Sequence, residues 1–296
     1  MIESALYAHL MSKEMELGSF LAYYDNKMAI FNQEVPDDKD PRWDKYSSQY
    51  GRIVFSVDMR GNPERKISGL LYIDVMCVKG GESPPPELLE PIIKSLVDNY
   101  FFPTTQGTMA VQWQSSNYFS EPEKKVCGVT LVFSLMAFPI QTALDPDPID
   151  LLNKWTEESF PNAHVVNHSE QPGAAWQPTE ENPAIYWRTT QITNCVWIPD
   201  TYTASWLTAT IRGHIISPDF SVNNAICRDI EQRLVVAKRI IFDDDSPLMI
   251  DRRPAAIAGA DPLKDGQISF EATFGVLNHK IPGARVGKVS FAHSDL

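Results

Sequence analysis

The sequence lacks any segment that would send the protein to a membrane or for export. No apolar run in its 296 residues approaches the roughly 20 residues of a membrane-spanning helix. The N-terminal segment carries acidic Glu3 and charged Lys13 and Glu14, where a signal peptide needs a basic flank and an unbroken apolar stretch. We therefore expect a protein that neither crosses nor binds membranes.

Cysteines and basic residues are both scarce. The four cysteines include no CxxC pair, so we expect reduced core thiols and neither a disulfide nor a metal site. They are Cys77, Cys127, Cys195 and Cys227. In a chain that is not exported, the glycosylation sequon at residues 167–169 is a chance match. Acidic residues outnumber basic ones by 38 to 26, and the net charge of −12 argues against sequence-independent binding of DNA.

Motifs for metal or nucleotide binding are missing as well. His164 and His168 have the spacing of two zinc ligands on a helix, but the valines between them favour a strand or loop, and no nearby glutamate completes a metalloprotease motif. Residues 243–245 are three aspartates, which we interpret as a solvated turn and not as a cation site. Gly80 and Gly81 follow an apolar run, but the SPPP sequence after them has no GK[ST] element, so we expect no phosphate loop.

No catalytic grouping can be assembled from the remaining residues. The six histidines are scattered, and no Ser/His/Asp or Cys/His arrangement follows from the sequence. Trp187 and Trp206 lie in strand-like runs, where tryptophan is most often a core or interface anchor. We therefore predict that the protein is not an enzyme and has no catalytic residue, cofactor-binding residue or metal ligand.

What the sequence does contain is the same pattern twice. An amphipathic segment, two alternating apolar runs, a second amphipathic segment and a long closing run occur in the first half and recur in order in the second. Three landmarks recur at offsets of 146, 136 and 142 residues: Glu3 and Ile149, Tyr72 and Thr208, Val126 and Ile268. A near-constant offset of this size predicts a duplicated unit as large as a domain.

Periodicity predicts the elements of each half. In the first half we expect helices at residues 3–17 and 87–101, a loop at 33–49, and strands at 52–59, 67–78, 109–118 and 126–138. In the second half we expect helices from residue 149 to before Pro161 and at 221–240, and strands at 184–193, 205–216, 248–251 and 267–277.

These elements predict an α+β fold of two similar domains. Each domain would have helices packed on a mainly antiparallel or mixed sheet. The expected boundaries are a first domain at residues 1–141, a linker at 142–150 that is rich in proline and aspartate, and a divergent second copy at 151–279. Residues 280–296 would form a C-terminal arm or tail.

The first half also resembles a known family. After the N-terminal helix, loop and hairpin come the segments GLLYIDVMCVKG, PELLEPIIKSLVDNYF and VCGVTLVFSLMAFP. Their order is similar to that of the small tail-terminator proteins of long-tailed bacteriophages. Residues 3–138 carry the resemblance, and residues 146–278 carry it more faintly. Members of that family are commonly single units, whereas this chain would hold two.

The resemblance implies a structural protein of the virion tail or neck, assembled in the host bacterial cytoplasm. Tail terminators form a ring, usually of six subunits, that ends tail-tube polymerisation and joins the tail to the head, while DNA passes through the lumen without specific binding. The implied partners are other copies of the chain, the tail-tube protein, a neck or head-completion protein and, in a contractile tail, the sheath protein. We favour six copies of the chain; three copies of a doubled unit would present a similar pseudo-sixfold surface.

Two other classes of function remain open. One is a duplicated tail-tube or other neck or connector protein, which a long insertion hairpin and filament formation in vitro would distinguish. The other is a ligand-binding module or an enzyme, which a cluster of titratable side chains in one deep cleft would distinguish.

Overall fold

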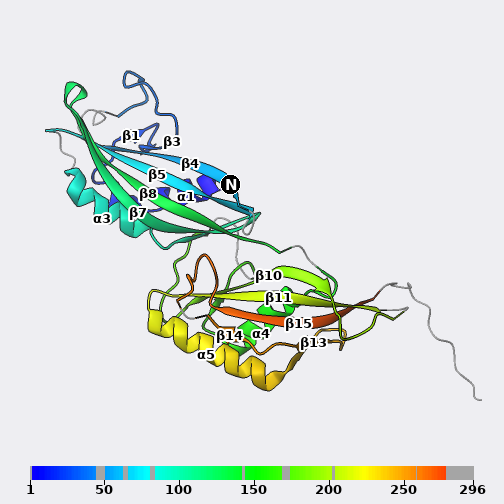
Figure 1. Ribbon diagram of the computed structural model, residues 1–296. Helices are drawn as coiled ribbons and strands as arrows, with labels where there is room; N and C mark the ends of the chain where they lie inside the picture. The colour runs from blue at the N-terminus through cyan, green and yellow to red at the C-terminus, as the bar shows by residue number, and fades with distance from the viewer. Residues whose placement is uncertain are drawn as a thin grey trace, which may run out of the picture.

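The protein is mixed α+β and consists of two units of similar size, one from each half of the chain (Figure 1). This computed structural model describes residues 2–44, 51–62, 66–80, 84–141, 144–168, 174–201, 204–257 and 259–277, without the side chains of residues 66, 67 and 124. The α+β class predicted from the sequence is confirmed. Gly81, Thr142, Ser169 and the expected arm at residues 280–296 lie outside the described residues.

The first unit is built on a six-stranded sheet with the order β3-β4-β5-β8-β7-β6. Neighbouring strands are antiparallel, except that the short β3 runs parallel to β4. Because apolar residues alternate along β5 and β8, one face of this central pair is buried and the other is partly exposed. The strands are β3 (Ile30–Asn32), β4 (Arg52–Asn62), β5 (Lys66–Val78), β6 (Phe101–Thr104), β7 (Gly107–Glu121) and β8 (Val126–Pro139); β1 (Tyr23–Tyr24) and β2 (Lys27–Met28) pair separately.

The two main helices of the first unit contribute to the same core as its sheet. Helix α1 (Ile2–Met11) buries Leu6 and Leu10, and helix α3 (Pro86–Val97) buries Leu89 and Ile93. All four side chains belong to one cluster of buried residues with the inward-facing side chains of β5 and β8. Their i, i+4 spacing places each pair on one side of its helix, which is why the two helices bury a single stripe.

Both predicted helices of the first half are shorter than the periodicity indicated. The chain turns at Ser12, whose hydroxyl donates to His9 O at 2.6 Å, and only a short helix α2 (Glu14–Leu17) follows, so the prediction of one helix at 3–17 is wrong. Helix α3 ends at Val97 and not at residue 101, because Asp98 is extended and Asn99 has a left-handed backbone with φ of 60°. Phe101, which the prediction placed at the end of this helix, starts β6 instead.

Histidine 9 makes the stability of the first unit depend on pH. Its Nε2 donates to Leu96 O at 2.8 Å, and burial, assisted by nearby Lys13, lowers its pKa below 6.5. The unfolded chain therefore takes up a proton near pH 6.5 that the folded chain does not, so the free energy of unfolding should fall as the pH drops through that value. We expect the melting temperature to fall between about pH 7.5 and 5.5, and His9→Gln to flatten this slope. An equal slope in the variant would contradict this role of His9.

The second unit repeats the architecture of the first. Its sheet has the order β12-β13-β15-β11-β10-β9, with the short β14 also paired to β15. The pairs are antiparallel, except that β9 runs parallel to β10. The strands are β9 (His164–Val165), β10 (Ala184–Asn194), β11 (Ala204–Ile216), β12 (Arg239–Ile241), β13 (Pro247–Ile250), β14 (Ala255–Ala256) and β15 (Ile268–Leu277), and the helices are α4 (Pro148–Ser159) and α5 (Phe220–Ala237).

The two sheets match strand for strand. Taken in chain order, β3, β4, β5, β6, β7 and β8 of the first unit correspond to β9, β10, β11, β12, β13 and β15 of the second, and the spatial order is the same in both. In each unit the first helix is followed by the short edge strand, which runs parallel to its neighbour. The second long helix connects β5 to β6 in the first unit and β11 to β12 in the second. The recurrence in the sequence is thus matched by a recurrence in topology.

Several boundaries in the second unit differ from the sequence prediction, most of them by one residue. Helix α4 begins at Pro148, one residue before the predicted start, because Asp147 caps it by accepting from the backbone N of Ile149 and Asp150. Helix α5 ends at Ala237 and not at residue 240, because Lys238 adopts a left-handed conformation with φ of 57°. The apolar residues after it form β12, which pairs with β13.

None of the helices within the described ranges combines the length and the apolar character that crossing a bilayer requires.

Candidate functional site

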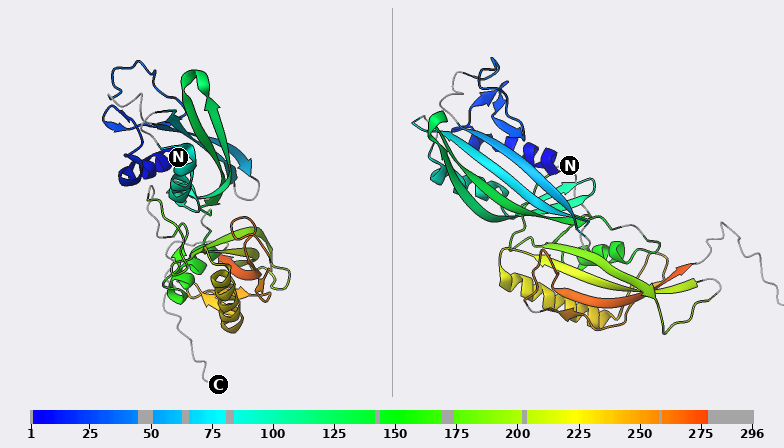
Figure 2. Two further views of the ribbon diagram at one scale, coloured as in Figure 1. Left: turned by 90° about the vertical axis from the view of Figure 1, so that its left-hand side faces the viewer. Right: turned by 45° about the horizontal axis from the view of Figure 1, so that its top comes forward.

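The contact between the two units is an ordered interface. We call it the joint and define it by seven buried side chains that form a separate cluster between the two cores. They are Phe101, Ala110 and Phe138 from the first unit and Val166, Ala184, Tyr186 and Ile216 from the second. Both views in Figure 2 show the units meeting at one end of the first sheet. An apolar cluster of this kind opposes separation of the neighbouring units.

Backbone and aromatic contacts reinforce the joint. Phe101 and Trp176 exchange two backbone hydrogen bonds of 2.7 and 3.0 Å, and their rings stack with centroids 4.7 Å apart. The Tyr186 hydroxyl donates to Pro139 O at 2.9 Å, and the Phe138 ring lies edge-on to that of Tyr186 at 4.9 Å. Hydrogen bonds and ring packing together restrict rotation of one unit against the other.

Asn167 is the polar centre of the joint. Its Oδ1 accepts from the backbone N of Thr108 at 3.0 Å and from the Thr108 hydroxyl at 2.9 Å, while its Nδ2 donates to Phe138 O at 2.8 Å. The residue has φ of 67°, a left-handed conformation that asparagine tolerates better than most residues. One amide side chain of the second unit thus holds two strands of the first.

Several strand edges of the sheets are open. On its outer side β7 pairs with β6 only from Gly107 to Ala110, and the backbone N of Trp113 donates to Asp98 Oδ1 at 2.7 Å, so within the described chain residues 114–120 have no strand neighbour there. At the other edge of the same sheet, β3 covers only Ile53 to Phe55 of β4, so residues 56–61 have no strand neighbour on that side among the residues that the structure describes. In the second unit β9 covers only Ala184 and Ile185 of β10. Open edges are where a strand of another chain can add.

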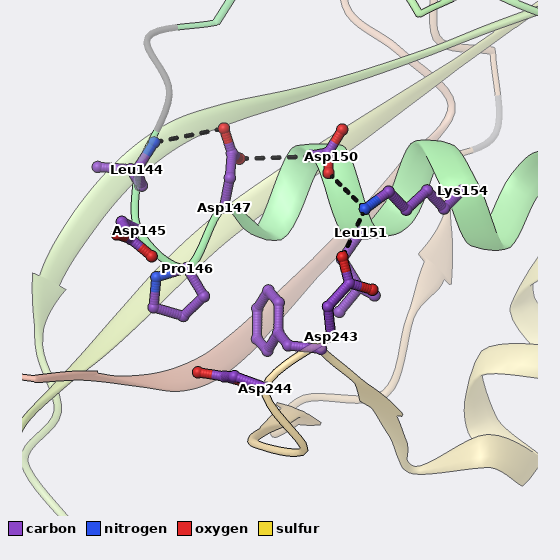
Figure 3. Close-up of a pocket in the computed structure, with 10 residues that line it drawn as sticks. Leu144, Asp145, Pro146, Asp147, Asp150, Leu151, Lys154, Asp243 and Asp244 are labelled. Carbon is purple, nitrogen blue, oxygen red and sulfur yellow. Dashed lines mark hydrogen bonds and ion pairs between the residues drawn. The ribbon is translucent and has the colours of Figure 1, made fainter. Parts of the chain in front are cut away.

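A shallow hollow in the second unit is lined mainly by aspartates. It has a volume of about 240 Å³ and lies between the start of α4 and the turn after β12 (Figure 3). Lys154 pairs with Asp243 at 2.9 Å and with Asp150 at 3.0 Å, and these contacts raise the pKa of Lys154. Asp147 is used as the helix cap, and Asp244 accepts from the backbone N and hydroxyl of Ser246. These carboxylates therefore pair with Lys154, cap α4 or stabilise the turn after β12.

The histidine pair does not converge on one point. His164 lies in β9, as the strand interpretation predicted, and its ring packs on Trp176 with centroids 4.0 Å apart. The Nδ1 atom of His168 lies 2.8 Å from Glu157 Oε1, and its Nε2 lies 3.6 Å from Asp150 Oδ1. Among the described residues, no group of three or more His, Cys, Asp or Glu side chains is placed to hold a metal ion.

The other residues that we considered from the sequence form a turn or pack within the fold. Residues 243–245 form the predicted turn. Trp187 is fully buried, and its Nε1 donates to Thr156 Oγ1 at 2.8 Å, whereas Trp206 is half-buried and packs on Gly275. Sequence reasoning missed Asn167 and Trp176, which make the joint; a polar residue in a left-handed turn next to a short strand carries no recognisable signal in one sequence.

Comparison of the sequence with protein-family models and with curated proteins finds no match.

Proposed function

We propose that the protein is a ring-forming tail terminator, a structural component that caps the tail tube of a bacteriophage and joins it to the neck. The observation that carries the proposal is the repeated unit: two sheets of the same strand order, joined at a fixed interface. A chain with two copies of one unit can supply two equivalent places of a cyclic assembly, provided that the contact between its units resembles the contact between neighbouring chains. The resemblance of residues 3–138 to tail terminators supplies the biological setting.

The open edges of the first unit support ring formation. A cyclic ring needs a head-to-tail interface in which two different patches of one subunit meet. Residues 56–61 of β4 and residues 114–120 of β7 are two such patches, at opposite edges of one sheet. Pairing of these edges between neighbours would continue the sheet around the ring, and closure would remove the free edges.

The shape and chemistry of the described surface also favour a structural role. The aspartates of the hollow and His168 take part in local pairs, such as Lys154 with Asp243 and His168 with Glu157. We infer that the protein has no catalytic activity, that its partners are copies of itself, the tail-tube protein and a neck protein, and that it belongs to the virion. Six copies are favoured and three are the alternative.

One feature favours the tail-tube alternative. The β7 and β8 hairpin is long, and β6 covers only the beginning of β7, so much of the hairpin stands free on one side (Figure 1). Tube proteins stack in many layers through such hairpins. A terminator should stop at closed single rings, whereas a tube protein should form filaments as concentration rises.

We expect the purified protein to form closed rings of six copies, measured by native mass spectrometry and electron microscopy of the same sample. Lysines on the open edge of β7, in the double variant Ser115→Lys and Asn117→Lys, should weaken ring formation by about tenfold or more, because a charged edge opposes strand pairing. The control adds the same charge to exposed positions of α5 with Asn224→Lys and Gln232→Lys and should leave ring formation unchanged.

A wild-type protein that stays monomeric at high concentration would contradict self-assembly. Filaments in place of rings would favour the tube alternative. In a phage that lacks this gene, tails of normal length would rule out the terminator role.

A further inference from the structure

Two cysteines lie opposite each other on the central strands of the first unit. Cys77 of β5 and Cys127 of β8 are register partners in an antiparallel pair. Residues directly opposite in such a pair point to the same face of the sheet, with Cβ atoms about 4.5 to 5.5 Å apart. The face is the inner one, because Val75 and Val129, two residues along each strand, are fully buried. The two thiols therefore face each other at the rim of the core.

The separation of the two Cα atoms allows a disulfide between Cys77 and Cys127, but the bond would be strained. Two residues further along the same register, Lys79 N donates to Lys125 O at 2.8 Å, so the cysteines also occupy a hydrogen-bonded position, where Cα atoms lie about 5.5 Å apart. That value is within the range that disulfides span, about 4.4 to 6.8 Å. The Cβ atoms must approach by about 1 Å, which strains the bond and makes it easier to reduce.

The two thiols differ in access. Cys77 is buried with 2% of its surface exposed, and this burial raises its pKa to about 12. Cys127 is partly exposed where β8 begins, just after the short turn η1 (Pro122–Lys124). An attacking thiol must reach the oxidant as a thiolate, so Cys127 is the one that reacts first and Cys77 is the resolving partner.

We propose that Cys77 and Cys127 form a reversible oxidation site that closes to a cross-strand disulfide in the presence of a small-molecule disulfide such as oxidised glutathione. The Cys127 thiolate attacks one sulfur of the oxidant, forming a mixed disulfide and releasing one thiol. Cys77 then loses its proton and attacks Cys127 Sγ, which forms the protein disulfide and releases the second thiol. The protein loses two hydrogens, and one oxidant molecule is reduced to two thiols.

The bond would add a covalent link between β5 and β8 near the turn of the β7 and β8 hairpin. Cys127 of β8 is the register partner of Ser120 in β7 as well as of Cys77 in β5, so it lies between those two strands. Linking the two cysteines closes a loop of 49 intervening residues that contains α3, β6 and β7. A crosslink of this span restricts the unfolded chain and stabilises the first unit. This proposal is independent of the ring.

The test uses the full-length protein with excess oxidised glutathione. We expect two of the four thiols to be lost, a mass change of two hydrogens, and a crosslinked peptide joining Cys77 to Cys127. The melting temperature should rise by roughly 5 °C or more and return to its starting value with dithiothreitol. Cys127→Ser should abolish the shift, whereas Cys195→Ser together with Cys227→Ala should preserve it.

Three outcomes would overturn the proposal: a stable glutathione adduct on Cys127 without a crosslink, dimers linked through Cys195, or four free thiols after oxidation. Because Cys127 is partly exposed, its serine variant is expected to fold, and circular dichroism of the reduced protein checks this independently.

Discussion

Leu96→Asp is expected to unfold the first unit. Leu96 lies on the buried side of α3, with 7% of its surface exposed, in the same cluster as the inner residues of β5 and β8. An aspartate there would place a charge among apolar groups without a partner, which costs on the order of 4 kcal/mol or more. A whole domain is stable by only about 5 to 15 kcal/mol, so a loss of this size removes most of the stability of a domain at the lower end of that range and lowers its melting temperature by about 10 °C or more.

The same helix provides a matched control. Leu88 has 60% of its surface exposed, so Leu88→Asp adds the same charge on the outer side of α3 and should change stability by about 0.5 kcal/mol or less. Thermal unfolding followed by circular dichroism distinguishes the two variants. If Leu96→Asp keeps the melting profile of the wild type, α3 does not face the sheet as described.

Asn167→Ala is expected to uncouple the two units. The substitution removes three hydrogen bonds across the joint, to Thr108 N, Thr108 Oγ1 and Phe138 O. Each such bond contributes about 1 kcal/mol, and alanine in the left-handed conformation costs about 1 kcal/mol more, so the joint should weaken by about 3 to 4 kcal/mol. Calorimetry should then show two transitions in place of one, because the units no longer stabilise each other.

Asn167→Gly distinguishes the loss of the hydrogen bonds from the strain of alanine in the left-handed conformation. Glycine adopts the left-handed backbone without strain but makes no side-chain hydrogen bonds, so it should lose about 1 kcal/mol less than alanine. Limited proteolysis gives a second measurement, with faster cutting between the units in both variants. A single transition of unchanged temperature in both variants would mean that the joint does not couple the units.

The repeat and most long elements could be predicted from the sequence, because their signals are local. Alternation along residues 126–138 requires only that one side of a strand be buried, and the structure has β8 there. The stripe of Leu89 and Ile93 likewise requires only helical spacing. Element ends were less certain, since Asn99 and Lys238 terminate helices through backbone conformations that tertiary contacts select.

The candidate surfaces could not be predicted in the same way. The short parallel strands β3 and β9 have two or three residues each, too few for a periodic pattern, yet they decide which strand edges remain open. The joint depends on Asn167 and Trp176 meeting residues of the other unit, and the facing cysteines depend on the register of β5 against β8. Register is fixed by pairing between distant segments, which no local pattern records.

The sequence by itself determined the mixed α+β class, the approximate positions of the long strands and helices, and the recurrence of one pattern in both halves. These follow from side-chain periodicity, which burial imposes on each segment separately. Only the tertiary structure decided the common strand order, the joint that fixes one unit against the other, and the pairing of Cys77 with Cys127. Those features arise where segments far apart in the chain come together, and the contacts that stabilise them form only when the sheet has formed.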